Sequence, residues 1–308
     1  MHRRFNFLFL LVIAAPAAFA QVVPVASVVP PERQSFYSRI RGLFDFNLPN
    51  IDPPGTIKLV LYPHVSDLLR RDYLRVDTGF RWAVSHRLEI NPEAAAYFSH
   101  GIRHGGSGAG IGEFRLGTKY ILPEWPNPAM KTSLTLDLQF PTGNPPVDLT
   151  DGLNHVAPGF LVEHHSRRYE KLTTFSGAGL DLVTTSHITG TPSRNTPRDS
   201  SMNFTAGAIY DLGQFKYTLS TTYATTALIG HTTQNFFYLR PSVLWYVPRK
   251  YTFNSRTRWI VGLGARVSFG PDGSEISVSN RLRAEITFRQ VMEKMRLYRP
   301  IGPDDNPP

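Results

Sequence analysis

The chain has 308 residues, 41% of them hydrophobic and 19% charged, with a mean hydropathy of −0.21 and a formal net charge of +9. This composition excludes a helical membrane protein, but it allows a transmembrane β-barrel, whose strands are only half apolar. The sequence contains no cysteine, which excludes disulfides and thiolate metal sites. The basic residues are interspersed with acidic ones along the predicted strands, so nucleic acid is not an expected partner.

The first twenty residues predict a signal peptide. Residues 1–4 are basic, residues 7–15 form an apolar run, and Ala18-Phe19-Ala20 is a small-x-small cleavage site before Gln21. The apolar run is too short to span a membrane. We therefore expect export across the inner membrane and removal of residues 1–20.

Residues 21–55 are rich in Val and Pro and then in basic and aromatic residues. One interpretation is an unstructured periplasmic N-terminal tether. The other is a short plug, because residues 35–43 could form a helix with Phe36, Ile40 and Leu43 on one side.

From residue 56 onward, apolar and polar residues alternate with a period of two, which is typical of strands with two different faces. Pro92 is expected near a strand end, where its missing N–H is tolerated. The predicted strands cover residues 57–61, 73–84, 88–99, 113–122, 133–140, 156–164, 172–184, 203–211, 215–223, 237–247, 259–269 and 275–288.

The last two segments show the pattern most clearly. Leu263 and Val267 belong to an apolar face with aromatic ends, whereas Gly264 and Arg266 belong to the opposite face. Residues 259–269 would extend about 33 Å at about 3.3 Å per residue. A tilt of about 40° projects this length to about 25 Å, the height of the apolar band of an outer-membrane barrel. The sequence therefore predicts an all-β fold: a single transmembrane antiparallel β-barrel of about 12 strands at residues 56–289.

The connections support this interpretation. The predicted periplasmic ones, 85–87, 123–130, 165–171, 213–214 and 248–254, are mostly shorter than the outer ones at 99–110, 142–155, 185–201 and 226–235. Two outer connections, 64–70 and the turn at Pro271, are short exceptions. A secreted β-sandwich, the main alternative, gives no reason for such asymmetry. The Pro-rich tail, residues 290–308, is expected in the periplasm.

The predicted inner face carries many charges. They could form a mutually paired lining that holds the wall together, or a pore lining that sets solute preference, with a slight basic excess that hints at anion tolerance. The expected pore-lining residues are Arg75, Asp77, Arg81, Glu113, Arg115, Lys119, Asp137, Arg240, Arg266, Arg281, Arg283 and Glu285. The expected lipid-interface aromatics are Trp82, Phe114, Tyr120, Phe140, Trp245, Trp259, Phe269 and Phe288.

Few motifs suggest chemistry. His164 and Ser166 resemble the His-x-Ser pair of outer-membrane phospholipases and lipid A deacylases, but Arg167 stands where those families have Asn. His100 and His104 flank a Gly-rich loop and could bind a metal ion, but we expect solvated side chains there. The sequence therefore predicts no catalytic residues, no metal site and no cofactor.

Two stretches indicate a family. The segment 110–120, GIGEFRLGTKY, and the segment 140–144, FPTGN, are similar to segments of the outer-membrane transporter-like family labelled for the meta-pathway of phenol degradation. The resemblance implies a barrel of about this strand count and passage of small, often aromatic or hydrophobic compounds. It implies no catalytic residues. The tail after Phe288 departs from barrels that finish on a terminal aromatic.

We therefore expect a channel in the outer membrane of a Gram-negative bacterium for passive passage of a small solute. The alternatives are a non-conducting structural barrel and a lipid-modifying enzyme that uses His164 and Ser166. The expected partners are outer-membrane lipids, the barrel assembly machinery and an unidentified solute.

Overall fold

The computed structural model describes residues 48–287, apart from 65–66, 71, 101–107, 124–129, 144, 147–148, 167, 192–194 and 253–256. For residues 69–70 and 279–281 it describes the backbone alone. All of these residues belong to one compact unit. The predicted signal peptide, the possible helix at 35–43 and the C-terminal tail lie outside the described residues.

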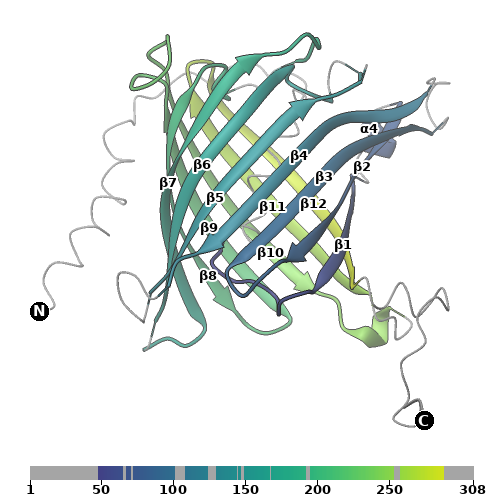
Figure 1. Cartoon of the computed structure of the whole chain (residues 1–308), viewed down its shortest axis with the longest axis vertical. Helices are drawn as coiled ribbons and strands as arrows, with labels where there is room; N and C mark the ends of the chain where they lie inside the picture. Colours follow the sequence, from purple (N-terminus) through teal and green to yellow (C-terminus); the bar gives the residue numbers. More distant parts are fainter. Residues whose placement is uncertain are drawn as a thin grey trace, which may run out of the picture. The chain divides into compact units, whose positions relative to one another are not determined.

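Twelve strands form one closed barrel, in which each strand pairs antiparallel with its sequence neighbours and β1 pairs with β12 (Figure 1). The predicted antiparallel barrel of about 12 strands is therefore confirmed. The strands are β1 (Ile57–Pro63), β2 (Tyr73–Ala83), β3 (Leu88–Ser99), β4 (Ala109–Ile121), β5 (Met130–Pro141), β6 (Leu153–His165), β7 (Leu172–Thr185), β8 (Ser201–Asp211), β9 (Phe215–Thr225), β10 (Asn235–Tyr246), β11 (Arg258–Gly270) and β12 (Gly273–Thr287).

The two ends of the barrel differ. At the terminal rim, where β1 begins and β12 ends, the connections are 84–87, 122–129, 166–171, 212–214 and 247–257, the last containing the 3-10 helix η2 (Arg249–Tyr251). At the loop rim they are 64–72, 100–108, 142–152, 186–200, 226–234 and 271–272, the first containing the four-residue helix α4 (Asp67–Arg70). The sequence pattern did not predict α4, which has Asp67 in its only turn.

Burial is inverted relative to a water-soluble protein. Leu263, Ile276 and Val278 point outward with 62%, 73% and 65% of their surface exposed, whereas Arg75 and Lys119 point inward and are 0% and 1% exposed. The period of two places most apolar residues of β11 and β12 outside and most polar ones inside; among the exceptions, Ile260 lies at an inward position and Ser274 at an outward one. An apolar outer face and a polar inner face are the arrangement that a lipid solvent requires.

Three prolines lie in strand interiors, where each interrupts the pairing with one neighbouring strand. Pro92 stands opposite Leu116 of β4, but the β2–β3 register has no partner for it, and Pro158 and Pro241 interrupt the β6–β7 and β10–β11 registers in the same way. The expectation that Pro92 lies near a strand end is therefore wrong. A proline nitrogen cannot donate a hydrogen bond. Each of these prolines therefore lacks backbone pairing with one neighbouring strand and keeps it with the other.

Within the part of the chain described, no helix has the length and apolar character needed to cross a membrane.

Candidate functional site: the barrel lumen

The predicted pore-lining residues for which side chains are described all lie at inward-facing register positions. Arg75, Asp77 and Arg81 lie on β2, Glu113, Arg115 and Lys119 on β4, Asp137 on β5, Arg240 on β10, Arg266 on β11, and Arg283 and Glu285 on β12. The side chain of Arg281 lies outside the described part.

The predicted interface aromatics lie on the opposite face. Trp82, Phe114, Tyr120, Phe140 and Phe269 are exposed, and Trp245 and Trp259 are half-buried at outward positions of β10 and β11. Rings also contact each other across strands: the Trp245 and Phe215 rings stack at a centroid distance of 6.3 Å, and those of Phe237 and Phe269 lie 6.2 Å apart. Phe288 lies outside the described residues.

On the lumen faces of β3 to β7, which we call the paired wall, opposite charges are matched. Lys119 stands directly across from Glu89, and its Nζ lies 3.1 Å from Glu89 Oε1. The guanidinium of Arg115 reaches Asp137 at 3.9 Å. The side chains of these four residues are at most 15% exposed, so these charges need partners inside the wall.

The centre of the paired wall retains polar atoms without a protein partner. Glu113 is 1% exposed, and neither of its carboxylate oxygens has a hydrogen-bond partner among the described residues. The amide of Gln139, which stands between Arg115 and His155 in the register, is also 1% exposed and has no partner there for either its nitrogen or its oxygen. Buried polar groups of this kind require water or a solute to satisfy them.

The first hairpin is held by buried ion pairs at the loop rim. Arg75 Nε donates to Asp67 Oδ2 at 2.8 Å, and the ring of His64 lies 2.6 Å from Asp77 Oδ2. Helix α4 thus places the carboxylate of Asp67 against Arg75 of β2.

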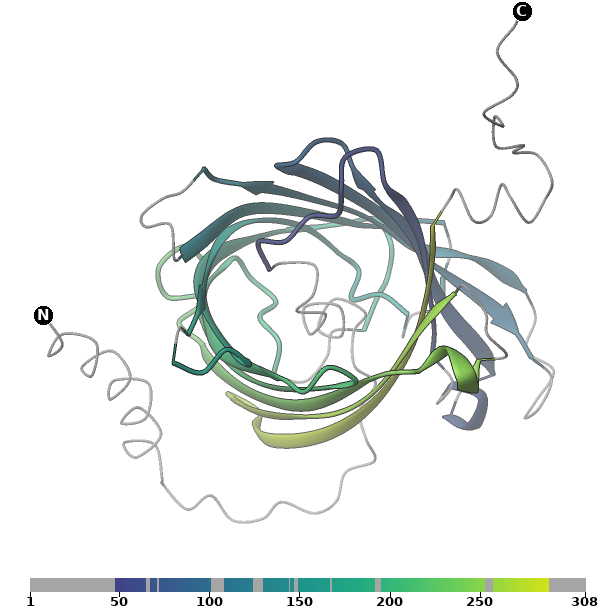
Figure 2. The same ribbon diagram turned by 90° about the horizontal axis from the view of Figure 1, so that it is seen from below.

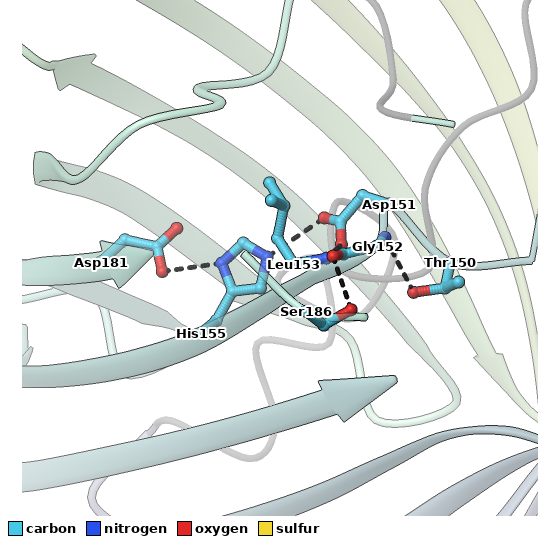
Figure 3. A network of polar contacts seen from close by, with 7 residues as sticks. All are labelled: Thr150, Asp151, Gly152, Leu153, His155, Asp181 and Ser186. Atoms are coloured by element: carbon cyan, nitrogen blue, oxygen red, sulfur yellow. Dashed lines mark hydrogen bonds and ion pairs between the residues drawn. The ribbon is translucent and has the colours of Figure 1, made fainter. Parts of the chain in front are cut away.

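His155 locks the connection 142–152 to the paired wall (Figure 3). Its Nδ1 lies 3.0 Å from Asp181 Oδ1 on β7, and its Nε2 lies 3.1 Å from Asp151 Oδ2 in the connection. A neutral imidazole has a single N–H, so only the protonated ring can donate to both carboxylates. The result is a cation held between two anions, with all three side chains at most 3% exposed.

A second set of contacts joins connection 142–152 to connection 186–200 (Figure 3). Ser186 Oγ donates to the Gly152 carbonyl at 2.8 Å, and Thr191 N donates to the Thr150 carbonyl at 3.0 Å. The two backbones approach so closely that a Cβ on Gly190 would lie 2.1 Å from Gly152 N. Gly152 also has φ +78°, which favours glycine.

Connection 186–200 then reaches the opposite wall through Asn195, which is 1% exposed and has φ 48°. Its side-chain amide donates to the Gly273 carbonyl at 3.0 Å, and its own carbonyl accepts from the Tyr238 hydroxyl at 2.8 Å and from Arg266 at 3.3 Å. These contacts bridge β10, β11 and β12. Asn195 therefore lies against the lumen face of β10–β12 near the loop rim.

From the other end, residues 48–56 turn inward across the opening of the barrel (Figure 2). Lys119 Nζ donates to the Asn50 carbonyl at 2.7 Å, and Lys58 forms an ion pair with Asp52 at 2.7 Å. Leu48 is 7% exposed and packs on an apolar lumen patch formed by Leu161, Phe175 and Ile209. Both mouths of the barrel are therefore narrowed by inserted chain.

The predicted His164–Ser166 pair is not assembled. His164 stands at an outward position of β6, opposite Met130, and Ser166 lies beyond the strand end, where its Oγ accepts a hydrogen bond from Tyr169 N at 3.1 Å. No hydrogen bond between the His164 ring and the Ser166 hydroxyl occurs among the described residues. Nor does the described part contain a group of three His, Cys, Asp or Glu residues arranged to hold a metal ion.

Outside the strands, the carboxylate of Asp199 holds connection 226–234 by hydrogen bonds to its backbone. Its carboxylate accepts hydrogen bonds from the backbone N–H groups of Ser200, His231 and Thr232. Slight desolvation acts to raise the pKa of Asp199, but the three N–H donors outweigh it and hold the pKa below its ordinary value.

Sequence reasoning missed several lumen residues. It assigned Asp151 and His155 to an outer loop, and it did not single out Asn195 or Tyr238. The alternation of β6 could have extended the strand to His155, because His155, Ala157 and Gly159 share one face. No sequence signal indicates that a loop folds inward rather than outward.

No protein-family model matches the sequence, and the curated proteins gave no match. Solved structures with a similar fold include outer-membrane channels and a porin. The COG4313 outer membrane channel from Pseudomonas putida F1 is 12% identical, with 78% of this chain and 97% of that chain covered and a TM-score of 0.48. The KdgM porin in complex with disordered oligogalacturonate is 8% identical, with 75% and 97% covered and a TM-score of 0.40. The outer membrane channel DcaP of Acinetobacter baumannii is 10% identical, with 76% and 95% covered and a TM-score of 0.30.

At such low identities and TM-scores, these neighbours carry no argument about activity or solute. The family label that the sequence segments suggested stays a prediction, because no family model matches the chain. The function proposed below therefore rests on the residues of this barrel.

Proposed function

We propose that this protein is an outer-membrane channel through which small solutes pass passively. The observation that carries the proposal is the inverted burial: a closed barrel with exposed apolar side chains outside and ionisable side chains inside. Unpartnered buried polar atoms on Glu113 and Gln139 favour a wet lumen, because a dry one would leave them unsatisfied. Localisation in the outer membrane belongs to the same proposal, since such strands cross a membrane only as a closed barrel.

The solute that this lining favours is polar rather than hydrophobic. Most inward positions carry charged, hydroxyl or amide groups, and the apolar patch of Leu161, Phe175 and Ile209 is already covered by Leu48. A hydrophobic or aromatic compound, which the family resemblance implied, would gain little on such a wall.

The second candidate is a barrel that does not conduct at rest. It is favoured by the inserted segments: Asn195 spans the loop rim, and Asn50 is held at the terminal rim by Lys119. In this case the paired charges serve to hold the wall together. An enzyme is not supported, because His164 and Ser166 do not meet.

The deciding experiment is single-channel conductance of residues 21–308, refolded into lipid vesicles and shown to be folded by heat-modifiable gel mobility. We expect reproducible current steps in a planar bilayer. Arg266→Glu should shift the permeability ratio toward cations, whereas Lys250→Glu, on the exposed helix η2, makes the same charge change outside the lumen and should not. A folded but silent wild-type barrel would refute the channel and leave the structural role.

A further inference from the structure

Two lumen-facing positions on neighbouring strands carry no side chain. Gly159 of β6 stands directly opposite Gly179 of β7. Gly159 shares the inner face of its strand with Leu161, which packs on Leu48. Both glycines are half-buried rather than buried, so the inner wall is accessible at this level.

The neighbourhood of these glycines differs from that of a glycine under a loop. At Gly112 the place of a Cβ is taken by Leu149, whose Cδ2 would lie 2.0 Å from it. The nearest described atoms to a Cβ on Gly179 belong instead to the backbone of β6, at 3.0 Å, and the nearest to one on Gly159 is Thr135 Oγ1, at 3.2 Å. The two glycines therefore form a floor that opens to the lumen.

Polar side chains border this floor on both sides. Asn203 of β8 stands directly opposite Gly179, and Thr135 of β5 stands directly opposite Gly159. We call these four residues, Thr135, Gly159, Gly179 and Asn203, the glycine row. Three strand spacings of about 4.8 Å separate its ends by about 14 Å, which leaves room for one ring-sized molecule.

The border on β8 carries polar atoms that the wall leaves unsatisfied. Asn203 is 7% exposed, and neither its Oδ1 nor its Nδ2 has a hydrogen-bond partner among the described residues. Ser201, two residues earlier on the same face, is 0% exposed, and its Oγ has none there either. A buried donor or acceptor left unsatisfied is costly, so these groups favour a ligand that supplies both functions.

The charged residues beside the glycine row already have oppositely charged partners. Lys119, Asp137 and Asp181 form ion pairs with Glu89 at 3.1 Å, Arg115 at 3.9 Å and His155 at 3.0 Å, respectively. A charged solute would have to break one of these buried pairs to gain a partner of its own. The row therefore favours a solute without charge.

We infer that the glycine row is a binding site for a neutral, ring-shaped solute with several hydroxyl groups. A hydroxyl both donates and accepts hydrogen bonds, so it can satisfy the Asn203 amide and the Ser201 hydroxyl, whereas a carboxylate only accepts and an ammonium only donates. The C–H groups of the ring would lie over the two glycines. The inference deepens the proposed function, on which it rests for the route by which a solute reaches the lumen.

The test is a titration of refolded residues 21–308, labelled with ¹⁵N-glycine and ¹⁵N-asparagine. D-glucose is the neutral probe, and D-glucuronate and D-glucosamine are its anionic and cationic counterparts, all at constant ionic strength. We expect the side-chain amide of Asn203 and the backbone amides of Gly159 and Gly179 to saturate with one dissociation constant for glucose. The charged sugars should bind at least tenfold more weakly.

Asn154 is the internal control. It lies on β6 at an outward position, and its side-chain amide donates to Thr184 Oγ1 at 3.3 Å. Its signal should not saturate with any of the three sugars.

Variants sharpen the result. Asn203→Leu should weaken the glucose affinity reported by Gly179 at least tenfold, and Asn154→Leu, the same change on the outer face, should alter it less than twofold. If Asn203→Leu does not refold, Gly159→Ala adds a methyl group to the floor and should weaken the affinity at least fivefold.

Two outcomes would overturn the inference. If no sugar gives saturable shifts at the glycine row, water alone satisfies Asn203 and Ser201, and the site is refuted. If glucuronate or glucosamine binds within tenfold of glucose, the assignment to neutral solutes is wrong.

These outcomes are separable from that of the channel. A barrel that conducts but shows no saturation refutes the glycine row only. A barrel that binds glucose at the row but passes no current supports the site and refutes the channel.

Discussion

The paired wall on β3–β7 and the facing strands β10 and β11 place charges against each other differently. In the paired wall, Lys119 and Glu89 face each other across strands, and His155 lies between two aspartates. On β10 and β11, Arg240 stands directly opposite Arg266. Opposite charges that face each other across two strands attract, whereas like charges in the same position repel. The comparison teaches that the register between neighbouring strands decides whether two lumen charges stabilise the wall.

The largest expected effect comes from breaking a pair in the paired wall. Lys119→Met leaves Glu89 buried without its cation and also removes the donor to the Asn50 carbonyl. We expect the free energy of unfolding to fall by about 3–5 kcal/mol, measured by denaturant titration in lipid vesicles. Arg266→Met removes a repulsion together with a stacking contact on Tyr238 and the hydrogen bond to the Asn195 carbonyl, so it should change the free energy of unfolding by less than about 1 kcal/mol. If both variants lose the same free energy of unfolding, oppositely charged and like-charged neighbours in the lumen do not differ in their contribution to stability.

The outer faces should not share this difference. Leu136 on β5 and Leu263 on β11 both point away from the lumen, with 36% and 62% of their surface exposed. Leu136→Arg and Leu263→Arg should each cost about 2–4 kcal/mol if both positions face the middle of the bilayer. The readout is the folded fraction by heat-modifiable gel mobility across a denaturant series. Wild-type stability of either variant would contradict the lipid-facing assignment of that strand.

A smaller effect is expected at His155. His155→Gln leaves one of Asp151 and Asp181 without a donor, at a cost of about 1–3 kcal/mol. His165→Gln is the matched control, because His165 lies on the same strand and contacts Glu163 but has a 54% exposed side chain. Thermal or denaturant unfolding should separate the two variants. If the two variants unfold alike, the buried contacts of His155 contribute no more stability than the exposed contact of His165.

The smallest effect is local and depends on pH. The pKa of Asp199 is lowered in the folded protein, so its clasp on connection 226–234 is fully present above the ordinary value of about 3.9 and is lost as pH falls through the lower folded value. The amide shifts of His231 and Thr232 should follow this titration. Asp199→Asn should remove the pH dependence, and an unchanged titration in that variant would assign it to another group.

Much of the barrel could be predicted from the alternation of apolar and polar residues and from the lengths of the alternating segments. The alternation in β11 and β12 separates Leu263 from Arg266 without ambiguity, and the turn between the strands lies where Pro271 and Asp272 predict it. The boundary of β6 was placed too late because Leu153-Asn154-His155 contains loop-forming residues. Pro92 was misplaced because a sequence does not show which neighbour of a strand can spare a hydrogen bond.

The site was less predictable than the fold. The two-residue alternation of a strand shows which of its residues face the lumen, so the individual lining residues could be named. Pairing depends on which strand positions are in register, and this set Arg240 opposite Arg266 but Lys119 opposite Glu89. The inward course of residues 48–52 and of Asn195 is decided by tertiary contacts that no local pattern records.

The junction of β1 with β12 has a consequence for assembly. The described register there contains four pairs, from Lys58–Thr287 to Leu61–Ala284, whereas β11 is paired with β12 along the whole length of β11. Its two strands also come from opposite ends of the barrel sequence, so their union has the greatest entropic cost of closure. We expect the wall to assemble as a curved sheet of hairpins and to close last at the β1–β12 junction. Pairing of the first and last strands would then set the rate at which the barrel inserts into the membrane.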